Sequence, residues 1–311
     1  MLQAMPGYLF SSLALILFTV AILATKAASS RIALSTGFLI ATAVNVVFAA
    51  AALGVQIALR GEGLTWSGHA LLLFAAAGAF ATYLGRWFFY ESVARFGPAR
   101  ASVFQISSPL FVALLTWLIL DEKLTRPAIF GMALTLTGLA LVAFKPGFFA
   151  RQKSAIGTLE NGFLKRILAS VFVLGLISSL AYAIGNVLRG AAVRTWPEPI
   201  AGALIGAISG LVLHVLLTPK KSELLRDFKT VNHEGMVLYT VVGVANISGQ
   251  MCTIASMRYI PLSVAALVTL CTPLLVIPLS LYLFKDQEAL RVTALLGAVL
   301  TLAGIALIIL R

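Results

Sequence analysis

The chain has 311 residues, of which 60% are hydrophobic and only 11% are charged, and its mean hydropathy is +1.00. Soluble domains carry about 25% charged residues, so the composition excludes a water-exposed globule and requires a surface that faces mostly lipid. The net charge of +12 comes from basic residues spread between apolar runs, which excludes nucleic acid as a partner. We expect a multi-pass protein of the cell membrane (inner or plasma membrane), with the lipid bilayer as a partner.

Ten apolar segments follow one another along the chain, each near the length of about 20 residues that crosses a bilayer. They are residues 6–25, 33–59, 70–91, 98–119, 127–145, 166–188, 199–218, 235–256, 261–284 and 291–310. Because lipid offers no hydrogen-bond partners, every backbone group must pair within its own segment, and we expect ten transmembrane helices.

The two halves of the chain carry the same motifs in the same order. The matched positions, offset by 163 to 166 residues, are Lys26/Arg189, Pro109/Pro273, Glu122/Glu288, Gly131/Gly297 and Gly138/Gly304. We therefore expect five-helix repeats at 6–145 and 166–311, joined by a polar linker at 146–165. An odd number of spans makes the second repeat enter the membrane from the opposite side, which gives an inverted-topology repeat.

The repeated pattern resembles the EamA-type transporters of the drug/metabolite transporter superfamily. It consists of a tyrosine in the third span (Tyr83 or Tyr90), small residues around 98–102, Pro109, Glu122-Lys-Leu, and Gly131 with Gly138. The resemblance covers nearly the whole chain. It implies an all-α basket of ten helices around a central cavity, and export of small metabolites, including amino acids.

One feature departs from the related four-span multidrug transporters, which use a glutamate in their first helix for proton coupling. The first and second spans of this chain contain no acid. The departure puts carboxylate-based proton coupling in doubt and leaves exchange and facilitated transport open.

Arg86 lies in the third apolar segment, about one turn before its expected end. Its long side chain could extend to the lipid headgroups beside Trp87. Helical spacing also places Tyr83, Arg86 and Tyr90 on one face, opposite small residues suited to close helix packing. The repeat pairs Arg86 with another polar residue, Gln250, 164 positions later. Both placements stay open, and the pairing with Gln250 favours the cavity.

A polar stripe runs along the sixth span, where Ser178, Tyr182, Asn186 and Arg189 are spaced by four, four and three residues. Such a stripe would be costly against lipid, so we expect it to face the protein interior. It would line either a substrate cavity or a seam of interhelical hydrogen bonds. Single polar residues of the same kind in other spans are Asn45, Asn246 and Gln250.

Pro109 and Pro273 lie at matching places inside apolar spans. A proline removes one backbone hydrogen bond, which would free the carbonyls of Gln105 and Thr269 near Ser108 and Thr272. The freed groups would either form two substrate-facing kinks or be satisfied locally by neighbouring hydroxyls. Gln105 and Ser108 are therefore candidate substrate contacts.

Other polar residues are expected at the membrane boundary. His214 lies one turn before the end of its span, which predicts an interfacial position. Glu122 and Glu288 follow the fourth and ninth spans and are expected to cap or pair. Glu91 and Arg95 have the i, i+4 spacing of an ion pair.

Enzymatic activity is not indicated, because no acid pair lies near a histidine and no nucleophile elbow or phosphate loop occurs. No metal-ligand set and no cofactor motif is present. We expect a secondary transporter that works by alternating access, as the inverted repeat indicates, and export is what the family resemblance implies. Lys26, Arg86 and Arg189 outnumber acids along the expected path, which favours an amino acid or organic anion as the small-molecule substrate. The alternatives are an exporter of lipophilic cations and, in another class, a non-transporting scaffold or sensor. A monomer is compatible with the sequence.

The orientation stays open at this point. Loops after odd-numbered spans carry 15 Lys and Arg residues, against 7 after even-numbered spans and at the C-terminus. The positive-inside rule then places both termini outside, whereas the resemblance implies cytoplasmic termini.

Overall fold

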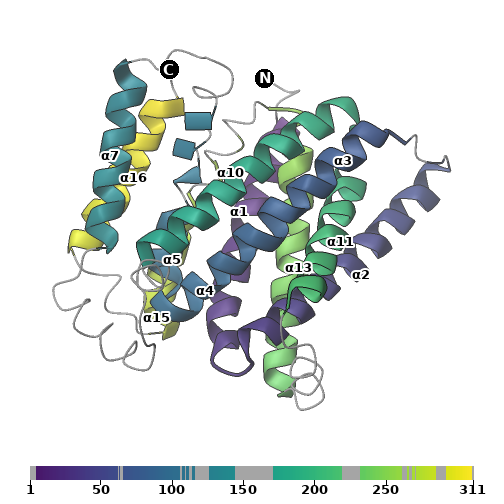
Figure 1. The fold of residues 1–311 in the computed structure, drawn as a ribbon, viewed down its shortest axis with the longest axis horizontal. Coiled ribbons are helices and arrows are strands. Elements are labelled where there is room, and N and C mark those ends of the chain that lie inside the picture. The colour runs from purple at the N-terminus through teal and green to yellow at the C-terminus, as the bar shows by residue number, and fades with distance from the viewer. Residues whose placement is uncertain are drawn as a thin grey trace.

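The computed structural model describes residues 5–61, 63, 66–105, 107–108, 110–111, 114–115, 126–143, 171–218, 232–260, 265, 268–269, 271–284 and 292–309. Within these ranges the regular elements are helices (Figure 1). The first half contains α1 (Met5–Ser29), α2 (Leu34–Arg60), α3 (Gly68–Ala77), the π-helix η2 (Gly78–Gly85), α4 (Arg86–Phe96), α5 (Pro98–Gln105) and α7 (Arg126–Ala143). The second half contains α10 (Val171–Thr195), α11 (Pro199–Leu217), α13 (His233–Ser256), α15 (Thr272–Phe284) and α16 (Val292–Ile309).

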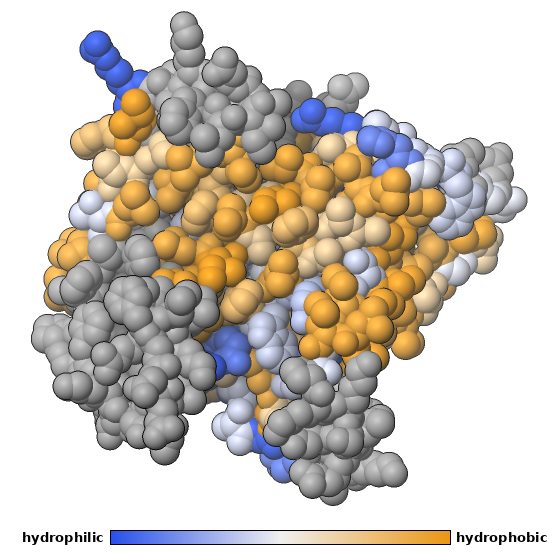
Figure 2. All heavy atoms as spheres, viewed as in Figure 1, coloured by the Kyte–Doolittle hydropathy of each residue, from blue (hydrophilic) through white to orange (hydrophobic). Residues whose placement is uncertain are grey.

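Six helices are long and apolar enough to cross a membrane, among the residues that the structure describes. They are Met5–Ser29, Leu34–Arg60, Gly68–Phe96, Val173–Thr195, Pro199–Leu217 and His233–Ser256. Figure 2 shows a mostly apolar face, with hydrophilic residues mainly toward its upper and lower margins. The chain is thus an all-helical, multi-pass membrane protein.

The third and sixth spans end later in the chain than the sequence predicts. The third span continues to Phe96, where Gly97, with φ 89°, ends α4 and Pro98 begins α5. Arg86 therefore lies ten residues from the end of the span, about 15 Å along its axis, rather than one turn. The sixth span likewise runs to Thr195, so Arg189 lies inside the helix and not at its end.

The α-helices pack in the way expected for close membrane helices. In Figure 1, α10 runs alongside α3 and α4, and α7 lies beside α16 at one end of the molecule. A Cβ added to Gly138 would lie 2.5 Å from the Gly297 carbonyl oxygen, and one on Gly304 would lie 2.5 Å from the Gly131 carbonyl oxygen. These glycines let the backbones of α7 and α16 touch in an antiparallel pair.

Several helix contacts occur twice, at a constant separation along the chain. Gly37 of α2 packs against the ring of Tyr239 in α13, and Gly202 of α11 packs against the ring of Phe74 in α3. Gly202 follows Gly37 by 165 residues, and Tyr239 follows Phe74 by 165 residues. The α2–α13 contact is therefore repeated as the α11–α3 contact.

The sequence offset between matched contacts of the two halves changes by one residue across η2. Before it, the Gly78–Gly206 contact matches the Gly243–Ala41 contact at an offset of 165 residues. After it, the Gly85–Tyr182 contact matches the Gly249–Phe18 contact at an offset of 164 residues. The first half thus holds one extra residue between its matched glycines, and a π-helical turn is the form in which a helix accommodates it.

Candidate substrate-binding site

Arg86 is buried at the first position of α4, with 4% of its surface exposed. Its Nη2 donates a hydrogen bond to Oε1 of Gln250 in α13, at 3.2 Å. This position argues against the headgroup placement, because a side chain that reached the headgroups would be exposed and free of such a partner.

Asn45 of α2 also contacts this guanidinium. With the amide oriented so that its nitrogen donates to the carbonyls of Gly243 (2.7 Å) and Ala41 (3.0 Å), its oxygen accepts from Nη1 of Arg86. That orientation satisfies all three groups, and amide orientations are assigned in this way from the hydrogen-bond network. Arg86 is therefore held by two neutral amides from two other helices.

Arg189 forms a second buried cation nearby, with 6% of its surface exposed. Its Nη1 donates to Oδ1 of Asn186 (3.3 Å), and its Nη2 donates to Oγ1 of Thr82 in η2 (3.2 Å). The ring of Tyr182 packs against Gly85, the residue before Arg86. The polar stripe predicted on the sixth span therefore faces the third span and not lipid.

Ser178, the remaining member of that stripe, supports the π-helix. Its hydroxyl donates to the carbonyl oxygen of Gly85 at 2.8 Å. The last residue of η2 thus receives its partner from a neighbouring helix, which is how irregular backbone is satisfied at membrane depth.

Tyr90 and Asn246 extend the contact between α4 and α13 by one turn beyond Arg86 and Gln250. Nδ2 of Asn246 donates to the Tyr90 hydroxyl oxygen at 2.8 Å. Tyr83, on the other side of Arg86, is partly buried and packs edge-on against Phe38. Tyr83, Arg86 and Tyr90 thus share the interior side of the third span, as their spacing predicts.

No carboxylate pairs with either buried arginine among the described residues. The ion pairs there are Arg31–Glu234, Arg60–Glu198 and Arg95–Glu91, and the last confirms the predicted i, i+4 pair. All three arginines are more than a third exposed. Within the ranges that the structure describes, the hydrogen-bond partners of Arg86 and Arg189 are therefore amide and hydroxyl groups.

Three buried polar atoms near this helix contact have no hydrogen-bond partner within the described part of the chain. They are Nε of Arg86, Nε2 of Gln250 and the hydroxyl of Tyr239. The first two belong to residues that already bond to one another, and both are obligate donors. The Arg86–Gln250 contact therefore offers two unused N–H groups to an acceptor.

The fourth and ninth spans contribute less to this cluster. Gln105 ends α5 half-buried and Ser108 is buried, and the hydrogen bonds of the two arginines in the described structure go to other residues. Pro109 lies outside the described residues, as do Glu122 and Glu288. Their roles stay predictions.

Pro273 is the second residue of α15, so it begins a helical stretch. The carbonyl freed at Thr269 accepts a hydrogen bond from the Thr272 hydroxyl. At Pro273, therefore, a neighbouring hydroxyl satisfies the freed carbonyl, which is one of the two predicted alternatives.

His214 lies in the last turn of α11, as predicted, but its side chain is buried and not open to the headgroups. It is 1% exposed, and its ring packs 4.7 Å from that of Phe38 and 5.5 Å from that of Trp87, between centroids. Its Nε2 donates to the carbonyl oxygen of Ser35 at 3.0 Å. Thr82 and Tyr239 were also missed, because a single hydroxyl in an apolar run has no signal of its own.

The model of the EamA-like transporter family matches residues 5–144 and again residues 169–310. The chain belongs to the EamA-like transporter family. The two matches cover both halves, and with the membrane helices they point to a transporter of small molecules rather than an enzyme. No curated protein matches the chain.

A solved protein crystal structure shares the fold of this EamA-like transporter. The two are 17% identical, the match covers 97% of each chain, and the TM-score is 0.60. At this identity the likeness establishes the fold alone.

Proposed function

We propose that this EamA-like protein is a secondary transporter that exports a small organic anion, or an amino acid bound through its carboxylate, across the inner or plasma membrane. The observation that carries the proposal is the pair of buried guanidinium groups, Arg86 and Arg189, which have only neutral partners among the described residues. Charges inside membrane spans are costly and mark substrate pathways. A carboxylate is the ligand that a guanidinium binds best, often through two parallel hydrogen bonds.

We further propose that the two halves are inverted five-helix repeats, ten spans in all, around a central site. The repeated contacts of Gly37 with Tyr239 and Gly202 with Phe74 support this. Arg86 and Gln250 are equivalent positions at the offset of 164 residues found after η2, and they touch. Two equivalent residues can touch only at the pseudo-two-fold axis, which in such repeats runs in the membrane plane near the midplane. Alternating access would then come from one repeat moving against the other around this point.

The proposal is tested by flux into proteoliposomes that contain the purified full-length protein. Radiolabelled lactate, malate, L-glutamate, L-alanine and inorganic phosphate are offered in turn, each with the same unlabelled compound inside, and a lipophilic cation such as tetraphenylphosphonium is offered as the competing class. We expect saturable uptake of at least one carboxylate. Uptake of the cation alone would establish the multidrug alternative, and no uptake of any compound would favour the scaffold.

A further inference from the structure

We infer that the transporter is an obligate anion exchanger, in which the site changes sides only when an anion occupies it. This inference rests on the proposed function and adds the mode of transport. The two directions of the cycle would then each carry an anion, and the empty protein would be held on one side of the membrane.

The charge balance of the site is the first part of the argument. Arg86 and Arg189 come from the third and sixth spans, and Arg189 donates to the hydroxyl of Thr82, which lies one helical turn before Arg86. The electrostatic interaction of the two arginines is repulsive. Shielding a charge from water inside protein costs several kcal/mol per ion unless a partner of opposite sign compensates it. An empty site that closes to water would hold two uncompensated positive charges. A bound anion would compensate one or both of them.

The unused hydrogen-bond donors point the same way. Nε of Arg86 and Nε2 of Gln250 are buried and have no acceptor among the described residues. Leaving a buried donor unpaired costs about 1–3 kcal/mol each, and more for a charged one. An anion at the Arg86–Gln250 contact would accept from both, so the same ligand compensates the charge and the donors.

Within the described part of the chain no carboxylate lies beside the two arginines, so a proton has no group there that it would neutralise. Proton-coupled carriers neutralise a buried carboxylate by protonating it, but protonation leaves a guanidinium positive. His214 is the buried histidine of the described structure, and its protonation would add a third positive charge instead of removing one. The chemistry of this site therefore favours a second anion over a proton as the species that allows the protein to return.

The experiment uses the same proteoliposomes, with the compound that gives the fastest uptake in the panel. Uptake of the labelled compound is compared between vesicles that contain the same unlabelled anion and vesicles that contain only buffered potassium gluconate, with gluconate first shown not to exchange. We expect uptake to be at least about tenfold faster with the internal anion. Equal initial rates in both would overturn exchange while leaving the proposed transport function standing, whereas no uptake in either would overturn the transport function itself.

A membrane potential set by potassium and valinomycin gives a second measurement that needs no variant. Exchange of one anion for an identical one moves no net charge, so a potential of either sign should drive no net accumulation of the anion. Net accumulation that follows the sign of the potential would mean net anion movement and would overturn the inference.

Arg189→Gln tests the role of the charge pair, since it removes one cation and keeps a polar amide. We expect the ratio of the initial uptake rate in anion-loaded vesicles to that in unloaded vesicles to fall toward one. Arg194→Gln is the matched control, because Arg194 is exposed at the end of the same helix. An Arg189→Gln protein that transports with the wild-type ratio would overturn the assignment to the arginines. If this variant does not transport, the two measurements on the wild-type protein decide.

Discussion

Arg86 donates its hydrogen bond to Gln250, the residue at the equivalent position of the other half of the chain. One turn further along, Tyr90 meets Asn246, so moving four residues up the third span corresponds to moving four residues down α13. The two helices therefore run in opposite directions where these side chains meet, and the side chains join them around Arg86. A membrane helix of this chain holds an arginine because that arginine lies at the contact between the halves, far from the headgroups.

Arg86→Gln should reduce the initial rate of carboxylate uptake by about 10- to 100-fold, corresponding to the loss of about 1.5–3 kcal/mol from a hydrogen bond to a charged group. Arg86→Lys should recover only part of the rate, because an ammonium lacks the planar pair of donors. Arg95→Gln is the control, since Arg95 lies on the same helix and is exposed. Wild-type flux in Arg86→Gln would remove this residue from the site.

The Tyr90–Asn246 hydrogen bond should contribute about 1 kcal/mol, the usual net value for a neutral pair. A double-mutant cycle of Tyr90→Phe and Asn246→Ala, read as the free energy of unfolding in detergent, measures this coupling directly. Additive effects of the two substitutions would show that the hydrogen bond is not maintained in solution.

Gly78→Val should destabilise the protein by about 2 kcal/mol or more, because close-packed interiors do not absorb added methyl groups. A Cβ at this position would lie 2.5 Å from the carbonyl oxygen of Gly206 on α11. Gly54→Ala is the comparison, since an added Cβ there meets no atom within 4 Å. Thermal unfolding followed by tryptophan fluorescence should separate the two variants clearly, and equal melting temperatures would contradict the helix contact.

Deletion of Ala79 should leave a folded protein with η2 converted to an ordinary α-helix. The deletion removes the one extra residue of the first half, so Gly78 and Arg86 can both keep their contacts. Deletion of Ala245, in the matching stretch of α13 between Gly243 and Gly249, should abolish folding, because that helix has no residue to spare. Size-exclusion profiles in detergent measure both, and an unfolded Ala79 deletion alongside a folded Ala245 deletion would reverse the assignment.

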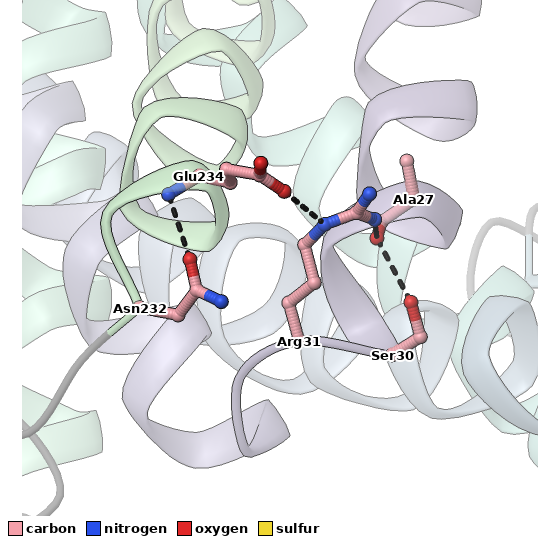
Figure 3. A network of polar contacts seen from close by, with 5 residues as sticks. All are labelled: Ala27, Ser30, Arg31, Asn232 and Glu234. Carbon is pink, nitrogen blue, oxygen red and sulfur yellow. Dashed lines mark hydrogen bonds and ion pairs between the residues drawn. The ribbon is translucent and has the colours of Figure 1, made fainter.

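The Arg31–Glu234 pair at the end of the molecule should matter little (Figure 3). Its nitrogen and oxygen are 3.2 Å apart, but the two side chains are 38% and 73% exposed. Exposed ion pairs contribute about 0.2–1 kcal/mol and are screened by salt. Glu234→Gln should therefore change the free energy of unfolding by less than 1 kcal/mol. A larger loss would mean that this contact holds α13 to the turn between α1 and α2.

The composition and the apolar periodicity determined the membrane class, the helices and their order. These follow from the sequence because a bilayer permits few spanning structures and imposes a length on each helix. The spacing of Ser178, Tyr182, Asn186 and Arg189 also predicted one shared face correctly, since helical geometry is local. The end of the third span at Gly97 was missed, because charged Glu91 and Arg95 weaken the apolar pattern without ending the helix.

Only the tertiary structure decided which polar residues meet. Arg86 is buried because α13 brings Gln250, and α2 brings Asn45, to the same point, and neither helix is near it in sequence. His214 is buried because rings from α2 and α4 surround it. The one-residue difference absorbed by η2 became visible only through matched contacts on both sides of it. Such pairings depend on the positions at which helices cross. These positions are set by the packing of several helices at once, so no single segment of the sequence predicts them.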